Sequence, residues 1–312
     1  MTPIPILLVG GYLGAGKTTL INHVLTVPGA PRMAAIVNDF GDINIDASLL
    51  GHVSNTVIGL KNGCICCSLQ GDLLSTLSSL TRRQPPPDAI IVETSGVANL
   101  ADIIRALFDP VIVTATPLDT VVTLVDLQSL SDHPALMDDP LWRTQLNAGD
   151  YLFLTKSDLV SANERSKLRK AIVTQRPGVP VFETRPGTFP TDLLFGNEYH
   201  LLRRPSLSRP VGDRFESTHW SSSAPLSLNR FQKIIRPVAA KSLRSKGLFR
   251  FVENPDQTVL FQSVGLRATL APSSVPLDAG TTAQFVVIGR QGEIDATEID
   301  RALNAMETIR QN

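Results

Sequence analysis

The sequence of 312 residues lacks long apolar runs, an excess of basic residues and scattered cysteines. The apolar stretch from Val111 to Val125 is interrupted by Thr, Pro and Asp, and no other run is long enough to span a bilayer. Basic and acidic residues balance at 29 each, whereas nucleic-acid and anionic-membrane surfaces usually carry a basic excess. No Lys or Arg precedes Lys17, so the basic region of a signal peptide is missing. These absences predict a cytoplasmic protein that binds neither nucleic acid nor membrane.

Cysteine is also scarce, and the three cysteines fall within four positions, at Cys64, Cys66 and Cys67. An odd and clustered set does not make a disulfide framework. In a reducing cytosol, such a set indicates thiol chemistry or metal ligation.

The first part of the chain alternates short apolar runs with amphipathic segments. The runs are mostly rich in Val and Ile and are bounded by polar residues or Gly, which is typical of buried strands. Strands that alternate with helices predict an α/β fold with a doubly wound, mostly parallel sheet. The predicted strands are Ile6–Val9, Ala35–Val37, Thr56–Ile58, Ala89–Val92, Thr120–Val125, Tyr151–Leu154 and Val179–Phe182, and the predicted helices are Lys17–Leu25, Asp72–Leu80, Asn99–Leu107 and Asn163–Thr174.

The pattern changes near Pro186, after which Pro, Gly, Ser and Arg dominate as far as Arg214. We therefore expect a first domain over residues 1–190, a linker over 191–214 and a smaller α+β domain over 215–312. The segment Ser242–Gly247 is interpreted as a basic surface contact or a solvated helix end. The second domain has predicted strands at Phe215–Trp220, Leu248–Glu253, Val259–Val264 and Phe285–Ile288, and predicted helices at Leu228–Leu243 and Ala296–Ile309.

A phosphate-binding motif follows the first predicted strand. Gly11 to Thr18 read GYLGAGKT and fit the pattern G-x-x-x-x-G-K-[ST] between a strand and a helix. The glycines let several N–H groups turn inward around phosphates, Lys17 reaches the outer phosphates, and the Thr18 hydroxyl binds Mg²⁺. A nucleoside triphosphate is therefore the expected ligand. The nucleotide-binding residues predicted here are Gly11, Gly14, Ala15, Gly16, Lys17, Thr18 and Thr19.

A carboxylate ends another predicted strand, in the segment IIVETSG from Ile90 to Gly96. Glu93 can hold Mg²⁺ directly or through water, and the Gly96 N–H can contact the terminal phosphate. The alternative is an ordinary strand end followed by a helix cap.

The segment YLFLTKSD, from Tyr151 to Asp158, resembles the base-reading element N-K-x-D of GTPases, with Thr155 in place of Asn. Asp158 can accept the ring imino N–H and the exocyclic amine of guanine, a donor pair that adenine lacks. The stem of Lys156 can pack over the base. The alternative is a helix N-cap at Ser157 or Asp158.

The three cysteines lie between a predicted strand and a predicted helix, where loops of an open α/β sheet line the ligand crevice. Soft thiolates suit Zn²⁺ or Cu⁺, and three of them leave one tetrahedral position open. Packed thiols or a redox pair of Cys64 and Cys67 are the alternatives. In VNDFGD, which ends another predicted strand, Asp39 or Asp42 can complete a metal site or order a water near the terminal phosphate. A simple turn explains this segment about equally well.

Taken together, these motifs make the sequence similar to the CobW family of P-loop GTPases, which are metal chaperones or metallocentre-assembly proteins. The similarity includes a second domain that resembles the family's C-terminal domain. It rests on GGYLGAGKTTLIN (residues 10–22), VNDFGDINID (37–46), GCICC (63–67), VETSGVAN (92–99), VVTLVD (121–126), LTKSDL (154–159) and SLRSKGLFRF (242–251).

The resemblance implies GTP hydrolysis coupled to delivery of a divalent metal, most often Zn²⁺, to a client metalloprotein. Cys64, Cys66 and Cys67 match the family's metal motif, with Asp39 as a further candidate ligand. Thr18 and Glu93 are the candidate Mg²⁺ ligands. A homodimer is a further expectation. The candidate catalytic residues are Lys17, Asp39 and Glu93.

Three features depart from the family pattern: Asp39 replaces the usual Glu, Thr155 replaces Asn, and no His-rich tract precedes the C-terminal domain. The rival hypothesis is a P-loop protein without a metal cargo. Such a protein would be a GTP-controlled interaction module or a small-molecule kinase.

Overall fold

The structure is a computed structural model. It divides the chain into two compact units, Met1–Phe195 and Gly196–Asn312, which are described separately below. The residues that it describes are 3–26, 32–38, 56–60, 68–185, 188–190, 193–194, 209–211, 215–265, 267–273, 277–278 and 280–307. The linker expected over residues 191–214 lies mostly outside this set.

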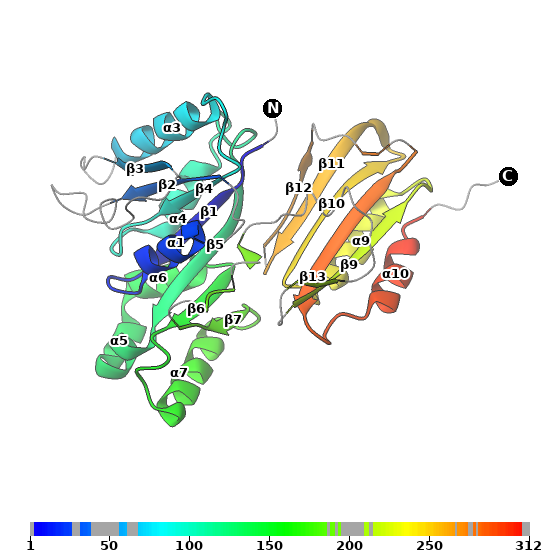
Figure 1. The fold of residues 1–312 in the computed structure, drawn as a ribbon. Coiled ribbons are helices and arrows are strands. Elements are labelled where there is room, and N and C mark those ends of the chain that lie inside the picture. The colour runs from blue at the N-terminus through cyan, green and yellow to red at the C-terminus, as the bar shows by residue number, and fades with distance from the viewer. Residues whose placement is uncertain are drawn as a thin grey trace. The chain divides into compact units, whose positions relative to one another are not determined.

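The first unit is built on a seven-stranded sheet in which every pair of neighbours is parallel (Figure 1). The strand order is β3-β2-β4-β1-β5-β6-β7, so β1 lies at the centre. Continuous apolar runs form the central strands because both of their faces are buried. The strands are β1 (Ile6–Gly11), β2 (Met33–Asn38), β3 (Thr56–Leu60), β4 (Ala89–Glu93), β5 (Leu118–Asp126), β6 (Tyr151–Thr155) and β7 (Val181–Glu183).

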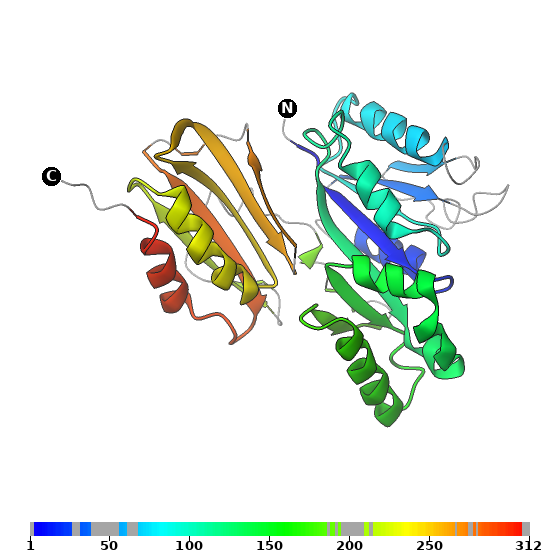
Figure 2. The same cartoon turned by 180° about the vertical axis from the view of Figure 1, so that it is seen from behind.

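Helices cover both faces of this sheet, with α4 and α6 on the face turned to the viewer in Figure 2 and α1 on the other. The predicted α/β class and its parallel sheet are confirmed. Sequence analysis missed the short helices between β5 and β6. The helices are α1 (Lys17–Thr26), α3 (Ser68–Thr81), α4 (Leu100–Leu107), α5 (Leu127–Asp132), the 3₁₀ helix η1 (Pro134–Asp138), α6 (Pro140–Ala148) and α7 (Ala162–Gln175).

The second unit contains an antiparallel six-stranded sheet of order β12-β11-β10-β13-β9-β8. Helices α9 (Leu228–Ala240) and α10 (Ala296–Asn304) pack on one face of it, around an aromatic core centred on Phe231 (Figure 2). The strands are β8 (Arg209–Val211), β9 (Phe215–Ser222), β10 (Arg244–Phe251), β11 (Asn254–Val264), β12 (Arg267–Pro272) and β13 (Ala283–Arg290).

Several predicted boundaries in this unit were wrong. The helix that starts at Leu228 ends at Ala240, and α10 ends at Asn304 rather than Ile309. The interpretation of Ser242–Gly247 as an exposed basic segment is also wrong, because Arg244 and Lys246 are buried in β10. Strand β12 was missed because none of its residues is buried and it contains no Val, Ile or aromatic residue of the kind typical of a strand.

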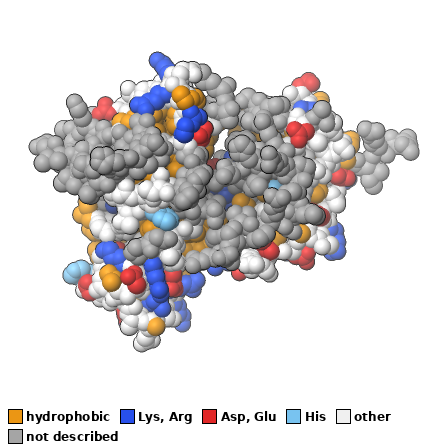
Figure 3. All heavy atoms as spheres, in the orientation of Figure 1, with side chains coloured by type: hydrophobic (Ala, Val, Ile, Leu, Met, Phe, Trp, Pro, Cys, Tyr) orange, Lys and Arg blue, Asp and Glu red, His pale blue; other side chains and the backbone are white. Residues whose placement is uncertain are grey.

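Charged side chains of both signs are intermixed over the described surface on the face seen in Figure 3. Around α7, for example, Arg165 and Arg169 both pair with Glu183. Among the described helices, none combines the length and the apolar character that a membrane crossing requires.

We predict that Phe231→Ala destabilises the second unit by about 3–5 kcal/mol, the usual cost of removing a buried Phe. Phe231 is buried and its ring contacts those of Phe249, Phe251 and Phe261. Urea unfolding followed by the fluorescence of Trp220, which belongs to the same core, measures the effect in a Trp142→Phe background.

The control is Leu270→Ala, at a side chain that is 42% exposed. An unfolding midpoint for Phe231→Ala equal to that of the control would contradict this description of the core.

Candidate functional site

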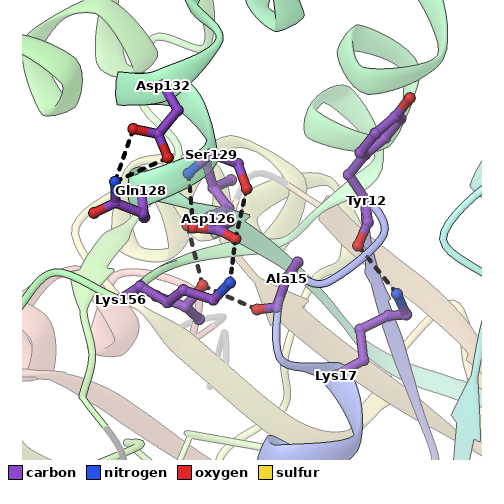
Figure 4. A network of polar contacts seen from close by, with 10 residues as sticks. Tyr12, Ala15, Lys17, Asp126, Gln128, Ser129, Asp132 and Lys156 are labelled. Atoms are coloured by element: carbon purple, nitrogen blue, oxygen red, sulfur yellow. Dashed lines mark hydrogen bonds and ion pairs between the residues drawn. The ribbon is translucent and has the colours of Figure 1, made fainter. Parts of the chain in front are cut away.

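The loop between β1 and α1 has the geometry of a phosphate cradle. Gly14 and Gly16 have φ angles of +71° and +92°, which side chains with a Cβ rarely adopt. The Lys17 ammonium folds back over the loop and donates to the carbonyl oxygen of Gly11 at 3.0 Å. It also donates to the carbonyl oxygen of Tyr12 at 3.2 Å, the contact marked in Figure 4. Helix α1 begins at Lys17, directly after the loop, so Thr18 and Thr19 lie in its first turn, and a helix N-terminus favours anions.

The predicted Mg²⁺ ligands come together at the first turn of α1. The Thr18 hydroxyl donates to Oε1 of Glu93 at 3.2 Å, because β4 lies beside β1 with Glu93 opposite Val9. Glu93 is 2% exposed. Adjacent oxygen ligands of an octahedral Mg²⁺ at about 2.1 Å lie about 3 Å apart, so this pair fits the ion.

The Ser95–Ala98 turn packs directly on the phosphate loop. A Cβ on Gly96 would lie 2.6 Å from the backbone nitrogen of Leu13, so only glycine allows this approach. Helix α4 is capped further along, by the side chain of Asn99. Glu93 and Gly96 therefore border the phosphate loop, and the cap of α4 does not involve them.

Sequence analysis missed Gln145, which holds this turn from helix α6. Its buried side-chain NH2 donates to the carbonyl oxygens of Gly96 and Ala98, at 3.0 Å each. The backbone carbonyl of Gln145 accepts from Thr123 Oγ1 on β5 at 3.0 Å. Helix α6 has few apolar residues in a helical period, so the sequence offered no signal for a polar anchor there.

The base-reading candidate, residues 155–158, is fixed at three consecutive positions. Thr155 Oγ1 donates to the Ala15 carbonyl at 2.9 Å, and the Lys156 ammonium lies 2.6 Å from Oδ2 of Asp126 (Figure 4). The Ser157 hydroxyl donates to the Thr184 carbonyl at 3.0 Å. These contacts tie the segment to the phosphate loop, to β5 and to the residue that follows β7.

Asp158 is exposed and makes no hydrogen bond or ion pair with any residue that the structure describes. The alternative of a helix N-cap at Ser157 or Asp158 is wrong, because Ser161 caps α7 by accepting from the Glu164 N–H. The Asp158 carboxylate is thus available to a ligand.

Asp39 and the three cysteines lie outside the described residues. In sequence, Asp39 follows the last residue of β2, and Cys64, Cys66 and Cys67 fall between β3 and α3. Within the described part of the chain, no group of three His, Cys, Asp or Glu side chains is placed to hold a metal ion.

The fold and the loop around Lys17 define a P-loop nucleotide-binding protein. Comparison with family models identifies it further: residues 5–183 match the CobW/HypB/UreG nucleotide-binding domain and residues 215–307 the CobW C-terminal domain. The chain belongs to this family, and the predicted resemblance is confirmed.

Similar curated proteins are named zinc chaperones. The chain is 32% identical to CobW of Pseudomonas aeruginosa, a match that covers 66% of this chain and 64% of that protein. It is 28% identical to CobW of a Sinorhizobium species, over 85% of this chain and 86% of that protein. It is also 28% identical to YjiA of Escherichia coli, over 85% of this chain and 87% of that protein. The solved structure of the Zn(II)-bound YjiA GTPase matches 99% of this chain and 100% of its own at 23% identity, with a TM-score of 0.48.

We predict that Gln145→Leu, which keeps the side-chain volume, loosens the turn that it holds. Two hydrogen bonds of about 1 kcal/mol each are lost, and one buried and one half-buried carbonyl lose a donor, so the free energy of unfolding should fall by about 2 kcal/mol. Hydrogen exchange of residues 93–99 should accelerate. Mass spectrometry measures the exchange, with the exposed neighbour Asn147→Ala as control. Equal protection in both variants would show that Gln145 does not hold the turn.

Proposed function

We propose that this protein is a cytoplasmic GTPase that binds a divalent metal, with zinc as the first candidate, and delivers it to a client metalloprotein. The observation that carries the proposal is the order of groups along one edge of the sheet. The base-reading segment, the phosphate loop and the Thr18–Glu93 pair follow β6, β1 and β4. The next two strands, β2 and β3, lead in sequence to Asp39 and the cysteines.

Guanine recognition is assigned to Asp158 and Lys156. The Asp158 carboxylate accepts the two donors on the guanine edge, and the aliphatic stem of Lys156 lies against the ring. The anchors at Thr155, Lys156 and Ser157 support this assignment, because a pre-ordered loop loses little conformational freedom when a base binds.

Phosphate binding and hydrolysis are assigned to the loop around Lys17. The ammonium leaves the carbonyls of Gly11 and Tyr12 and neutralises the outer phosphates, while the loop N–H groups hold them. Thr18 and Glu93 would hold Mg²⁺, which supplies charge neutralisation when bound. The Gly96 N–H senses the terminal phosphate, and Asp39 orders the attacking water.

Metal binding is assigned to Cys64, Cys66 and Cys67, whose thiolates suit Zn²⁺, with Asp39 as a further candidate ligand. The zinc-chaperone names of the relatives support this assignment. Strand β2, which Asp39 follows in sequence, lies between β4, which carries Glu93, and β3, which precedes the cysteines. Loss of the terminal phosphate would therefore act on the cysteine segment through adjacent strand ends. Coupled binding of GTP and metal is the expected consequence. The homodimer stays a prediction.

We predict that Asp158→Asn exchanges guanine for xanthine specificity. The asparagine carbonyl can accept only one of the two guanine donors, and its NH2 then faces the other as a second donor, so GTP affinity should fall by roughly 100-fold. Xanthine carries a carbonyl where guanine has the amine, and the amide N–H can donate to it, so affinity for xanthosine triphosphate should rise. Competition against a fluorescent nucleotide measures both.

The matched control for Asp158→Asn is Asp132→Asn, an exposed carboxylate on α5. Unchanged GTP preference in Asp158→Asn would remove this residue from the base site.

We predict that Cys66→Ser lowers Zn²⁺ affinity by about 100-fold or more, because even the loss of an outer partner of a metal ligand costs 10- to 100-fold. GTP binding should persist. Titration with Zn²⁺ and a chromophoric competitor, with and without a non-hydrolysable GTP analogue, measures both the affinity and its coupling to nucleotide.

The control is His133→Ala, which removes an exposed imidazole and should leave zinc binding unchanged. Full zinc affinity in Cys66→Ser would overturn the metal assignment. Zinc affinities that do not respond to the GTP analogue would instead favour an interaction module.

A further inference from the structure

Asp126 ends β5 opposite Thr155, the first residue of the base-reading segment. Its carboxylate is buried and receives three donors. Oδ1 accepts the Ser129 N–H at 3.0 Å, and Oδ2 accepts the Ser129 hydroxyl at 2.8 Å and faces the Lys156 ammonium at 2.6 Å (Figure 4). One oxygen therefore caps α5, and the other is shared between the same serine and Lys156.

Lys156 has an unusual backbone conformation. Its φ angle is +54°, and among the described residues it is the one non-glycine residue with a positive φ. This region is disfavoured for a residue with a Cβ, and it persists only where surrounding contacts impose it. The neighbours of Lys156 supply such contacts, since Thr155 and Ser157 are both anchored through their hydroxyls.

The ion pair also fixes where the Lys156 side chain runs. Its side chain is 38% exposed, whereas that of Asp126 is 5% exposed, so a surface lysine is drawn to an inward carboxylate. A free lysine side chain samples many rotamers, and ordering it when a base binds would cost affinity. The pair with Asp126 orders it beforehand.

We propose that Asp126 is a positioning residue for the nucleotide base, holding the Lys156 stem in the place where it packs on guanine. This inference rests on the proposed guanine site and deepens it. Asp126 acts through Lys156 and does not touch the nucleotide. Its effect should therefore appear for ligands that carry a base and be absent for ligands that carry only phosphates.

Capping of α5 and positioning of Lys156 can be separated by Asp126→Asn. The amide oxygen keeps the cap, since Asn is as good an N-cap residue as Asp. The amide nitrogen takes the place of Oδ2 and presents donors to an ammonium that is itself a donor. The helix should stay capped while the lysine loses its partner.

The experiment measures dissociation constants of the full chain for GDP, GTP and inorganic tripolyphosphate by competition against a fluorescent guanine nucleotide. We expect Asp126→Asn to weaken GDP and GTP about ten-fold and to leave tripolyphosphate within about two-fold. Lys156→Ala should have a similar effect. The double variant should bind GDP no more weakly than Lys156→Ala alone, because residues that act through one contact are not additive.

Asp132→Asn is the matched control. It removes a carboxylate at the other end of α5, one that accepts from Gln128 and makes no described contact with Lys156. It should bind all three ligands as the unaltered chain does.

Three results would overturn the inference while the guanine site stands: GDP affinity unchanged in Asp126→Asn, an equal loss for GDP and tripolyphosphate, or additive losses in the double variant. Failure of the unaltered chain to bind any guanine nucleotide would instead overturn the proposed function and this inference with it.

Discussion

All seven strands of the first sheet point the same way, and the candidate site depends on this constraint. In a parallel sheet each strand delivers the residue that follows it to one shared edge. Because β1 lies between β4 and β5, with β6 beyond, the ends of these strands flank the phosphate loop. β2 and β3 end at the same edge, with β3 about 14 Å from β1 at the usual strand spacing. An antiparallel neighbour would carry its terminal side chain to the opposite edge.

The strand ends are polar and buried, so each needs a partner. Glu93, Asp126 and Thr155 are 2%, 6% and 5% exposed. A buried polar group that loses its partner costs about 1–3 kcal/mol. Glu93 accepts from the first turn of α1, Asp126 from α5 and Lys156, and Thr155 donates to the phosphate loop. The contacts that stabilise these strand ends are therefore also the contacts that order the loops around the site.

The sequence predicted the parts of this arrangement that leave a recognisable pattern of residues, either an apolar run or a motif of fixed spacing. The apolar runs gave the seven strands, and the glycines and Lys17 gave the phosphate loop. Helix α6 was missed because its inward residues include the polar Gln145, which hydrophobic periodicity does not detect. Arg244 and Lys246 were expected at the surface because of their charge, although β10 buries them. Asp126 was passed over because a carboxylate at a strand end is identical in sequence whether it caps a helix or also pairs with a lysine.

Thr155 stands where the N-K-x-D pattern has Asn, and this replacement changes which residues of the base-reading segment can contact a base. An asparagine has an amide that can donate and accept at once, whereas the Thr155 hydroxyl has one proton, which is directed to the Ala15 carbonyl. The residue serves as a tie between two loops and contributes no donor to a base. In the site proposed here, base recognition is therefore assigned to Asp158, which is exposed, and to the Lys156 stem. The proposed choice of guanine over adenine does not require Asn at position 155, because it depends on a carboxylate that accepts two donors, and the chain has one at Asp158.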